Sequence, residues 1–450
     1  MTKPSLLPSL GRELAALARE HGVPGAQLAI HQDGRTVTAE VGELASGTGR
    51  PVTTDTAFAI GSITKTFTAT TTMVLADDGD VDLDACVGEY LSGLADLGDQ
   101  ATLRHLLSHT SGLADGPDPR EVPDSALHRY VKEHCLGRNL VFRPGAGFSY
   151  SNLGYVLVGR IIETVTGMSW REAVESIVLR PLGITPAFVD GTAPRAPGRP
   201  VAVGHSVNAR IGRIRPVHPS LTPAHAATGA LAMSATDLVA LAGLHLGAGV
   251  PALLPAEYAA RMRSAVPGAD PFGLADGWGL GLAVYREADT TWVGHDGNIN
   301  GVSSYLRIDP AGGRVVALTA NANSGAALWQ ELRSHLDDLG IPLARARRHA
   351  PLRISTAPPA GCAGAYTNGD VEHLVVDKED GNVYLSVDGG GLERLTFYDE
   401  LTFTIEDPTT GREVLGGRFL RDPATGEIDA LQMGGRRTRR RATTYAVRVA

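Results

Sequence analysis

The pattern of hydrophobic and polar positions changes from a helical to a strand-like period near the start of the chain. Leucines recur every three or four residues from the seventh position, which predicts an amphipathic helix over residues 7–21. Apolar and polar residues then alternate over 27–31 and 36–41, on either side of an Asp33-Gly34 pair. Because Asp-Gly accepts the positive φ of a tight turn, these two runs predict a β-hairpin.

The middle of the chain has helical patterns, and the part that follows it has strand patterns. An uninterrupted run over 62–76, directly after Gly61, predicts a helix. Helical patterns mixed with loops rich in Pro and Gly continue over 82–265, which predicts a mostly helical insert. Together with the strands that follow, this order indicates an α+β fold, in which an antiparallel sheet is flanked by helices and accompanied by a helical subdomain. The strand signals lie at 279–285, 290–294, 302–308 and 314–320.

The last hundred residues show a different pattern. An arginine-rich stretch over 344–349 and a stretch rich in Pro and Ala over 357–361 indicate a linker. Short alternating runs follow, separated by Gly, Asp and Pro, and these predict a small β-barrel. We therefore expect an α+β domain over 1–345, a linker over 346–360 and a barrel over 361–450. The alternating runs are 373–376, 382–387, 394–397, 401–405, 418–421 and 428–433.

Composition and charge restrict the classes of partner. The 450 residues suffice for two or three packed units, and 43% hydrophobic residues argue against wholesale disorder. A net charge of -8 offers no attraction for phosphate backbones or anionic lipid, so neither nucleic acid nor a membrane is an expected partner. The three cysteines are scattered, and the first thirty residues lack the apolar core of a signal peptide. Both features predict a cytoplasmic protein.

The first candidate for chemistry is Ser62. Lys65 follows it by three residues, so on a helix the two side chains share a face and the hydroxyl can meet the amine. A serine hydroxyl becomes nucleophilic when a neighbouring base takes its proton, and lysine is such a base once its surroundings lower its pKa from about 10.4. The alternative is a helix-capping serine beside a solvated lysine.

Two further groups of residues suit the same chemistry. Tyr150 and Asn152 precede a helical pattern, where a tyrosine can relay a proton and an asparagine can hold an amide. His295 and Gly297 follow the predicted strand over 290–294. There His295 could donate a hydrogen bond to the Tyr150 region, and Gly297 would let a substrate backbone approach. Taken singly, each group is also compatible with an ordinary helix cap or a structural histidine.

In this order and at these separations, the three groups resemble the motifs of the serine β-lactamase and penicillin-binding protein superfamily. The Tyr-x-Asn and His-x-Gly elements resemble those of its branch of class C β-lactamase-like esterases and D-stereospecific peptidases. Supporting stretches extend the resemblance over roughly residues 6–340. These stretches are LRHLLSHTSGL at 103–113, PGAGFSYSNLGY at 144–155 and TGALAMSATDL at 228–238.

The resemblance implies a role for each motif residue. Ser62 is the acylated nucleophile, and Lys65 and Tyr150 move its proton, with the acylation base left open between them. The backbone N–H groups of Ser62 and Asn298 form the oxyanion hole, which contributes about 3 kcal/mol per donor in comparable sites. The implied catalytic residues are thus Ser62, Lys65, Tyr150 and His295, where His295 supports the electrostatics at Tyr150, and the implied substrate-binding residues are Asn152, Gly297 and Asn298.

Other chemistries have less support. His105 and His109 have the i, i+4 spacing of a zinc pair but lack a glutamate base and a third ligand, so both are expected to be structural, without a metal. The chain has no Gly-x-Ser-x-Gly elbow and no phosphate-binding loop, and no cofactor is expected. An arginine run near the C-terminus is interpreted as a solvated strand or tail. Alternatively, part of it clamps a substrate carboxylate, with the candidates Arg439, Arg440 and Arg441.

The predicted barrel resembles the lipocalin-like domain that follows the catalytic domain in penicillin-binding-protein-type thioesterases, which release and cyclise nonribosomal peptides. This resemblance implies a serine acyltransferase that takes a peptidyl thioester from a peptidyl carrier protein onto Ser62. It then releases the peptide by head-to-tail macrolactam formation, with hydrolysis as a side reaction. Two alternatives stay open, a D-stereospecific peptidase, amidase or esterase, and an inactive ligand-binding receptor module.

Overall fold

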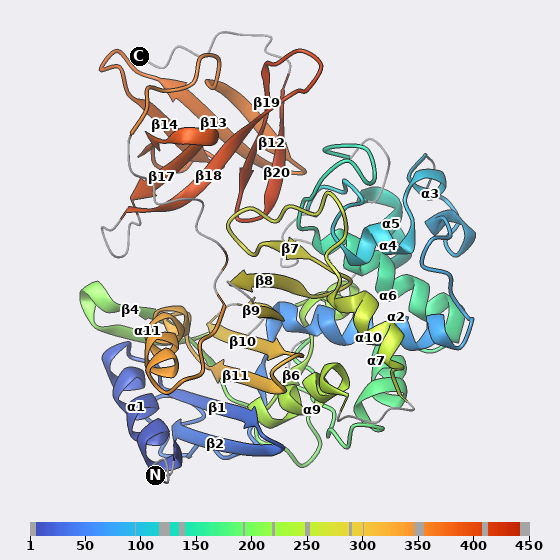
Figure 1. Cartoon of the computed structure of the whole chain (residues 1–450), viewed down its shortest axis with the longest axis vertical. Coiled ribbons are helices and arrows are strands. Elements are labelled where there is room, and N and C mark those ends of the chain that lie inside the picture. Colours follow the sequence, from blue (N-terminus) through green and yellow to red (C-terminus); the bar gives the residue numbers. More distant parts are fainter. Residues whose placement is uncertain are drawn as a thin grey trace.

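Two antiparallel sheets, one of seven strands and one of nine, organise the molecule (Figure 1). The second sheet curls into a nearly closed barrel that lies beyond one edge of the first (Figure 1). The structure is a computed structural model, and it describes residues 6–94, 96–116, 127–134, 140–191, 194–217, 221–247, 253–287, 290–299, 301–344, 346, 355–406 and 413–441.

The seven-stranded sheet brings the two ends of the first 345 residues together. Its N-terminal hairpin pairs with the strand that comes last in this part of the chain, and the Asp33-Gly34 turn has positive φ at both residues, as predicted. The spatial order of the strands is β2 (Arg35–Gly42), β1 (Gly25–Gln32), β11 (Arg314–Ala320), β10 (Val302–Asp309), β9 (Thr290–Ile299), β8 (Ala283–Glu287) and β7 (Gly277–Trp278).

Both faces of this sheet are buried, which explains why its central strands are almost continuously apolar. Successive side chains of a strand point to opposite faces. In β11, Val315 and Ala317 therefore belong to one hydrophobic core, whereas Val316 and Leu318 belong to the other. Helices α1 (Leu6–Glu20) and α11 (Gly325–Asp338) cover the second core, and the remaining helices lie with the first.

The helical region lies between β2 and β7 in the chain, as expected. Helix α6 is capped at both ends: the hydroxyl of Ser151, its N-cap, accepts a hydrogen bond from Gly154 N, and Gly167, its C-cap, has φ 69°. No helix within the described residues combines the length and apolarity needed to cross a bilayer. The helices of this region are α2 (Thr64–Asp77), α3 (Asp96–Gln100), α4 (Leu103–Leu107), α5 (Leu127–His134), α6 (Asn152–Thr166), α7 (Trp170–Val174), α8 (Ala226–Gly229), α9 (Ala235–Leu246) and α10 (Ala256–Arg263).

Two details of the sheet differ from the sequence prediction. Only the second half of the strand predicted over 279–285 is a strand, because residues 279–282 form the turn between β7 and β8. In this turn Gly279 N donates to Leu282 O, and Gly281 has φ 79°. The strand predicted over 290–294 continues to Ile299, because β10 pairs with it from Val293 to Ile299. Two short pairs complete this part, β3 (Phe58–Ala59) with β6 (Ala232–Met233), and β4 (Gly204–Asn208) with β5 (Arg213–Val217).

The predicted C-terminal barrel is confirmed, with nine strands instead of the six runs that the sequence indicates. The arginine run is a strand that pairs on both sides, so it is not a tail. Most of the predicted linker lies outside the described residues, and the domain boundaries therefore stay predictions. The spatial order is β15 (Glu393–Arg394), β14 (Val383–Val387), β13 (Val371–Asp377), β12 (Gly364–Asn368), β20 (Arg436–Arg440), β19 (Ile428–Met433), β18 (Glu413–Arg421), β17 (Thr402–Glu406) and β16 (Thr396–Phe397).

Candidate active site

Ser62 lies in a short 3-10 turn, Gly61–Ile63, that leads into α2. Gly61 has φ 49°, and a Cβ atom at this position would lie 2.9 Å from the Asn298 carbonyl oxygen. Glycine is therefore required where the turn approaches strand β9. Ser62 is partly exposed, whereas the residues on either side of it are buried, so its hydroxyl faces the accessible side of the turn.

Lys65 is fully buried one turn after Ser62, and the alternative of a solvated lysine is wrong. Its Nζ atom lies 3.0 Å from Ser62 Oγ and donates to the Thr228 carbonyl oxygen, also at 3.0 Å. Burial lowers the pKa of Lys65 to about 7, with Asp115 opposing this shift and Arg436 adding to it. Near neutral pH a substantial fraction of the amine is therefore uncharged and can accept the Ser62 proton.

The Tyr150 side chain is buried beside the Lys65 amine, whose Nζ atom lies 5.1 Å from the centre of the tyrosine ring. Burial raises the pKa of the phenol, and the nearby Ser62 hydroxyl opposes this shift. The phenol oxygen makes no well-formed hydrogen bond to a described residue. Tyr150 thus carries its proton at neutral pH, in a position suited to donating it.

His109, which the sequence predicts to be structural, holds the segment around Tyr150 from three directions. Its carbonyl oxygen accepts from Ser149 N at 3.0 Å, and its Nδ1 accepts from Ser151 N at 3.1 Å. Its ring lies 4.2 Å from the Tyr150 ring at an interplanar angle of 31°. His105 has a different structural role, since its Nδ1 accepts from Thr102 N at the start of α4.

We expect His109→Asn to lower kcat about tenfold and leave KM nearly unchanged, because the ring that fixes the Tyr150 phenol is lost. Asparagine tolerates the left-handed backbone at this position, φ 57°, and offers an oxygen to Ser151 N. Steady-state kinetics and thermal unfolding of the variant are the measurements. An unchanged kcat, or a loss that only follows unfolding, would contradict a positioning role.

His295 lies just beyond the paired part of β8 and β9, because Gly294 of β9 pairs with Ala283, the first residue of β8. Its Nδ1 lies 2.6 Å from the Asp296 carbonyl oxygen, which can only accept, so Nδ1 carries a proton. Burial lowers the pKa of His295 to about 4, so the ring is neutral and its Nε2 is an acceptor. The expected hydrogen bond from His295 to the Tyr150 region is therefore corrected: the neutral ring can accept there but not donate from Nε2.

Gly297 and Asn298 form the contact between β9 and the turn that carries Ser62. A Cβ atom at Gly297 would lie 1.9 Å from the Ile60 carbonyl oxygen, so no larger residue fits without a shift of the backbone. The Asn298 backbone lies beside Gly61 in the same way. This close approach is compatible with the pair of amides, from Ser62 and Asn298, that the resemblance implies as an oxyanion hole.

Asp115 is the residue on which several parts of the site converge, and the sequence did not identify it. Its carboxylate accepts from Asn152 N at 3.0 Å and from Asn152 Nδ2 at 3.4 Å. Its backbone N donates to Asn368 Oδ1, in the barrel, at 2.6 Å. Asp115 therefore fixes the Asn152 amide and joins the helical region to the barrel. The stretch LRHLLSHTSGL at 103–113 ends two residues before Asp115, so this motif locates the loop but does not identify the carboxylate.

Arg436 brings the arginine run of the barrel to the site. Its Nε donates to Asp115 Oδ2 at 2.8 Å, and its guanidinium lies 5.2 Å from the centre of the Tyr150 ring. The adjacent Gly435 carbonyl oxygen accepts from Tyr150 N at 2.9 Å. The turn between β19 and β20 is thus part of the site. The sequence alone does not show this, because Asp115 and Arg436 are 321 residues apart.

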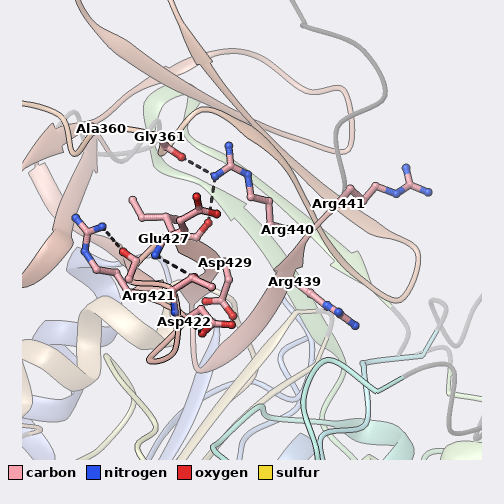
Figure 2. A pocket seen from close by; sticks show the side chains of 12 residues that line it. Ala360, Gly361, Arg421, Asp422, Glu427, Asp429, Arg439, Arg440 and Arg441 are labelled. Atoms are coloured by element: carbon pink, nitrogen blue, oxygen red, sulfur yellow. Dashed lines mark hydrogen bonds between the residues drawn. The ribbon is translucent and has the colours of Figure 1, made fainter.

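The candidates Arg439, Arg440 and Arg441 do not lie with Arg436, which corrects the sequence prediction. They line a separate hollow of about 830 Å³ at the far end of β20 (Figure 2). Arg440 donates there to the carbonyl oxygens of Gly361 and Ala363. The reason is strand geometry, because three residues along a strand span about 10 Å.

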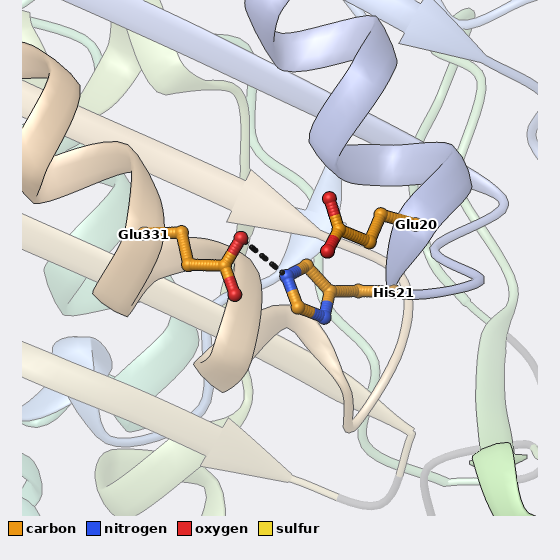
Figure 3. A group of neighbouring side chains, drawn as sticks. All are labelled: Glu20, His21 and Glu331. Atoms are coloured by element: carbon orange, nitrogen blue, oxygen red, sulfur yellow. Dashed lines mark ion pairs between the residues drawn. The ribbon is translucent and has the colours of Figure 1, made fainter.

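One group of possible metal ligands lies in the described part of the chain, between α1 and α11 (Figure 3). His21 Nε2 lies 3.2 Å from Glu331 Oε2, and Glu20 is close to both. Glu20 is exposed, and the group has only three ligands, whereas a structural zinc site has four. We interpret it as a contact between the two helices.

Comparisons with known proteins agree with the fold. The family model described as Beta-lactamase matches residues 10–340. Penicillin-binding protein 4 of Amycolatopsis lactamdurans is 36% identical over 368 residues, 77% of this chain and 94% of that protein. The crystal structure of SurE superposes with a TM-score of 0.85 at 39% identity, covering 96% of this chain and 98% of SurE, and a second SurE structure contains D-Leu. A D-stereospecific amidohydrolase from Streptomyces sp. is 29% identical with a TM-score of 0.58, covering 72% of this chain and 97% of that chain.

Proposed function

The chain belongs to the β-lactamase family of serine hydrolases, and we propose that within this family it is an acyltransferase that cyclises a peptidyl thioester. The family is one of enzymes with a serine nucleophile, which leaves no support for the inactive receptor alternative. The observation that carries the proposal is the barrel turn at Gly435 and Arg436, which forms part of the site around Tyr150.

In the first step Ser62 Oγ attacks the thioester carbonyl. A C–O bond forms, the C–S bond breaks, and the Ser62 proton leaves through the Lys65 and Tyr150 pair to the departing thiolate, which becomes a thiol. The lowered pKa of Lys65 and the raised pKa of Tyr150 favour the amine as acceptor and the phenol as donor. The developing oxyanion is stabilised by the amides of Ser62 and Asn298.

In the second step the N-terminal amine of the same peptide attacks the ester. A C–N bond forms, the C–O bond to Ser62 breaks, and the amine proton returns to Ser62 Oγ through the same pair. Water in place of the amine gives the linear acid, so hydrolysis is the expected side reaction. Asn152, fixed by Asp115, is placed to hold a peptide amide during both steps.

Two observations support a peptide with a D-residue as the acyl group. SurE, which matches this chain through both the sheet domain and the barrel, also has a structure with D-Leu. The second observation is the likeness to the D-stereospecific amidohydrolase, which matches only the larger part of the chain. We therefore propose a substrate whose C-terminal residue is D-configured. The likeness to that amidohydrolase favours, as second candidate, a D-stereospecific amidase or peptidase with water as acceptor.

We expect a linear peptide with a D-residue at its C-terminus, offered as the N-acetylcysteamine thioester, to give a product one water lighter than the linear acid. Product mass and tandem fragmentation are the measurements. The matched control is the same thioester with an acetylated N-terminus, which lacks the attacking amine and should give only acid. Exclusive hydrolysis of the free-amine substrate would remove the cyclase proposal, and rapid turnover of D-residue amides would support the second candidate.

A further inference from the structure

The hairpin formed by β4 and β5 projects from the sheet domain beside α1 and α11 (Figure 1). Every residue from 208 to 216 is exposed. Ile211 at its tip is 67% exposed, the largest value for a large hydrophobic side chain among the described residues, and Ile214 is 40% exposed. At 67% exposure the Ile211 side chain makes little contribution to a core, which raises the question of what it contacts.

The base of the hairpin, in contrast, is firmly held. His205 is buried; its N donates to the Gly301 carbonyl oxygen at 2.8 Å, and its Nδ1 lies 2.9 Å from the Asn321 carbonyl oxygen. Asn323 accepts from Val207 N at 2.7 Å and donates to Val207 O at 3.3 Å. Because an isolated two-stranded hairpin is at best marginally stable, these bonds are what hold the exposed tip in place.

The charge of the hairpin is opposite to that of the whole chain. Residues 204–217 contain three arginines and neither Asp nor Glu, although the chain has a net charge of -8. No carboxylate among the described residues forms an ion pair with Arg213 or Arg215, and both side chains are exposed. The tip therefore offers isoleucines surrounded by positive charge, which complements an acidic protein surface with an apolar patch.

The hairpin base also contacts the end of the candidate active site. Gly301 follows β9, which carries His295, Gly297 and Asn298. A Cβ atom at Gly301 would lie 2.6 Å from His205 N, so the two backbones touch. The hairpin therefore connects its tip, about 20 Å away along the strand direction, to the strand that is expected to supply an oxyanion-hole amide.

We propose that the β4–β5 hairpin is the docking surface for the carrier protein that delivers the peptidyl thioester, which would bind through an acidic surface, an inference that rests on the function proposed above. An anionic membrane is the less suitable partner. Three arginines are fewer than the four to eight basic residues typical of lipid-binding clusters, and the net charge of -8 repels such a surface.

The test compares two substrates that carry the same peptide, one on a peptidyl carrier domain and one as the N-acetylcysteamine thioester. The variant Ile211→Ser/Arg213→Glu should lower kcat/KM for the carrier-bound substrate at least about tenfold, through KM, and change the small thioester by less than about twofold. The matched control is Leu392→Ser/Arg394→Glu, which alters the same types of exposed side chain on the barrel, where Leu392 is 41% exposed.

An equal loss of kcat/KM for both substrates, or an unchanged kcat/KM for the carrier-bound substrate, would overturn the docking proposal. So would binding of the hairpin to anionic vesicles, or a dimer of this chain that the variant dissociates. If the wild-type protein turns over neither thioester, the proposed function fails, and docking is judged separately. Fluorescence anisotropy of a labelled, peptidyl-loaded carrier domain with Ser62→Ala then decides: affinity that does not depend on the hairpin substitutions overturns the proposal.

Discussion

Replacing Lys65 with methionine should slow the acylation of Ser62 by about three orders of magnitude, because the amine that accepts the hydroxyl proton is removed. Methionine is suited to this fully buried position, since it keeps most of the side-chain volume without a charge. The measurement is the rate of covalent labelling by a fluorophosphonate, followed by intact mass. Ser62→Ala should show no adduct at all.

The pH dependence of labelling separates a base from a residue that only shapes the site. In the wild-type protein the rate should rise as pH increases through about 7, where Lys65 loses its proton. The residual rate of the methionine variant should lack this rise. Labelling of Lys65→Met at the wild-type rate, or with the wild-type pH profile, would show that another group activates Ser62.

Substitutions of Asp115 and Arg436 should shift this pH profile in opposite directions. Asp115 raises the pKa of Lys65 and Arg436 lowers it. Removing the carboxylate in Asp115→Asn therefore lowers the pKa of Lys65 further, and the rise of the labelling rate moves to lower pH. Removing the cation in Arg436→Gln raises the pKa of Lys65, and the rise of the labelling rate moves to higher pH. A double variant should return towards the wild-type midpoint.

Both single variants should also lose ten- to a hundredfold in kcat/KM, since Asn152 and the loop around Tyr150 lose a fixed partner. Rate profiles from pH 5 to 9 and thermal unfolding give the two readouts. Shifts in the same direction for both variants would contradict the electrostatic account. A loss of activity that simply follows loss of folded protein would show that the pair is only structural.

The sequence predicted those parts of the fold and site that depend on local spacing. Lys65 meets Ser62 because residues three positions apart lie on the same face of a helical turn. The hairpin of β1 and β2 forms where Asp33-Gly34 accepts positive φ. The barrel was predictable from short alternating runs. In the first two cases the interacting positions are close in the chain, and in the barrel each strand is visible by its own period, so that residue type and period contain the information.

The rest of the site depends on contacts between distant segments. Asp115 and Arg436 are separated by 321 residues, and no periodicity relates them. The arginine run was recognised, but the turn between β19 and β20 decides which of its members reaches Tyr150, and that turn is fixed only by the folded barrel. The tautomer of His295 likewise follows from a carbonyl 2.6 Å away, not from the His-x-Gly pattern.

The hydrogen bond from Tyr150 to Gly435 and the ion pair of Asp115 with Arg436 have a consequence for heat inactivation. The barrel is the smaller unit and buries the smaller hydrophobic cluster, so it is the part expected to melt first on warming. Its melting would release the phenol and the arginine while the seven-stranded sheet is still native. The upper temperature limit of turnover would then be set by the barrel, and grafting a more heat-resistant barrel would extend it.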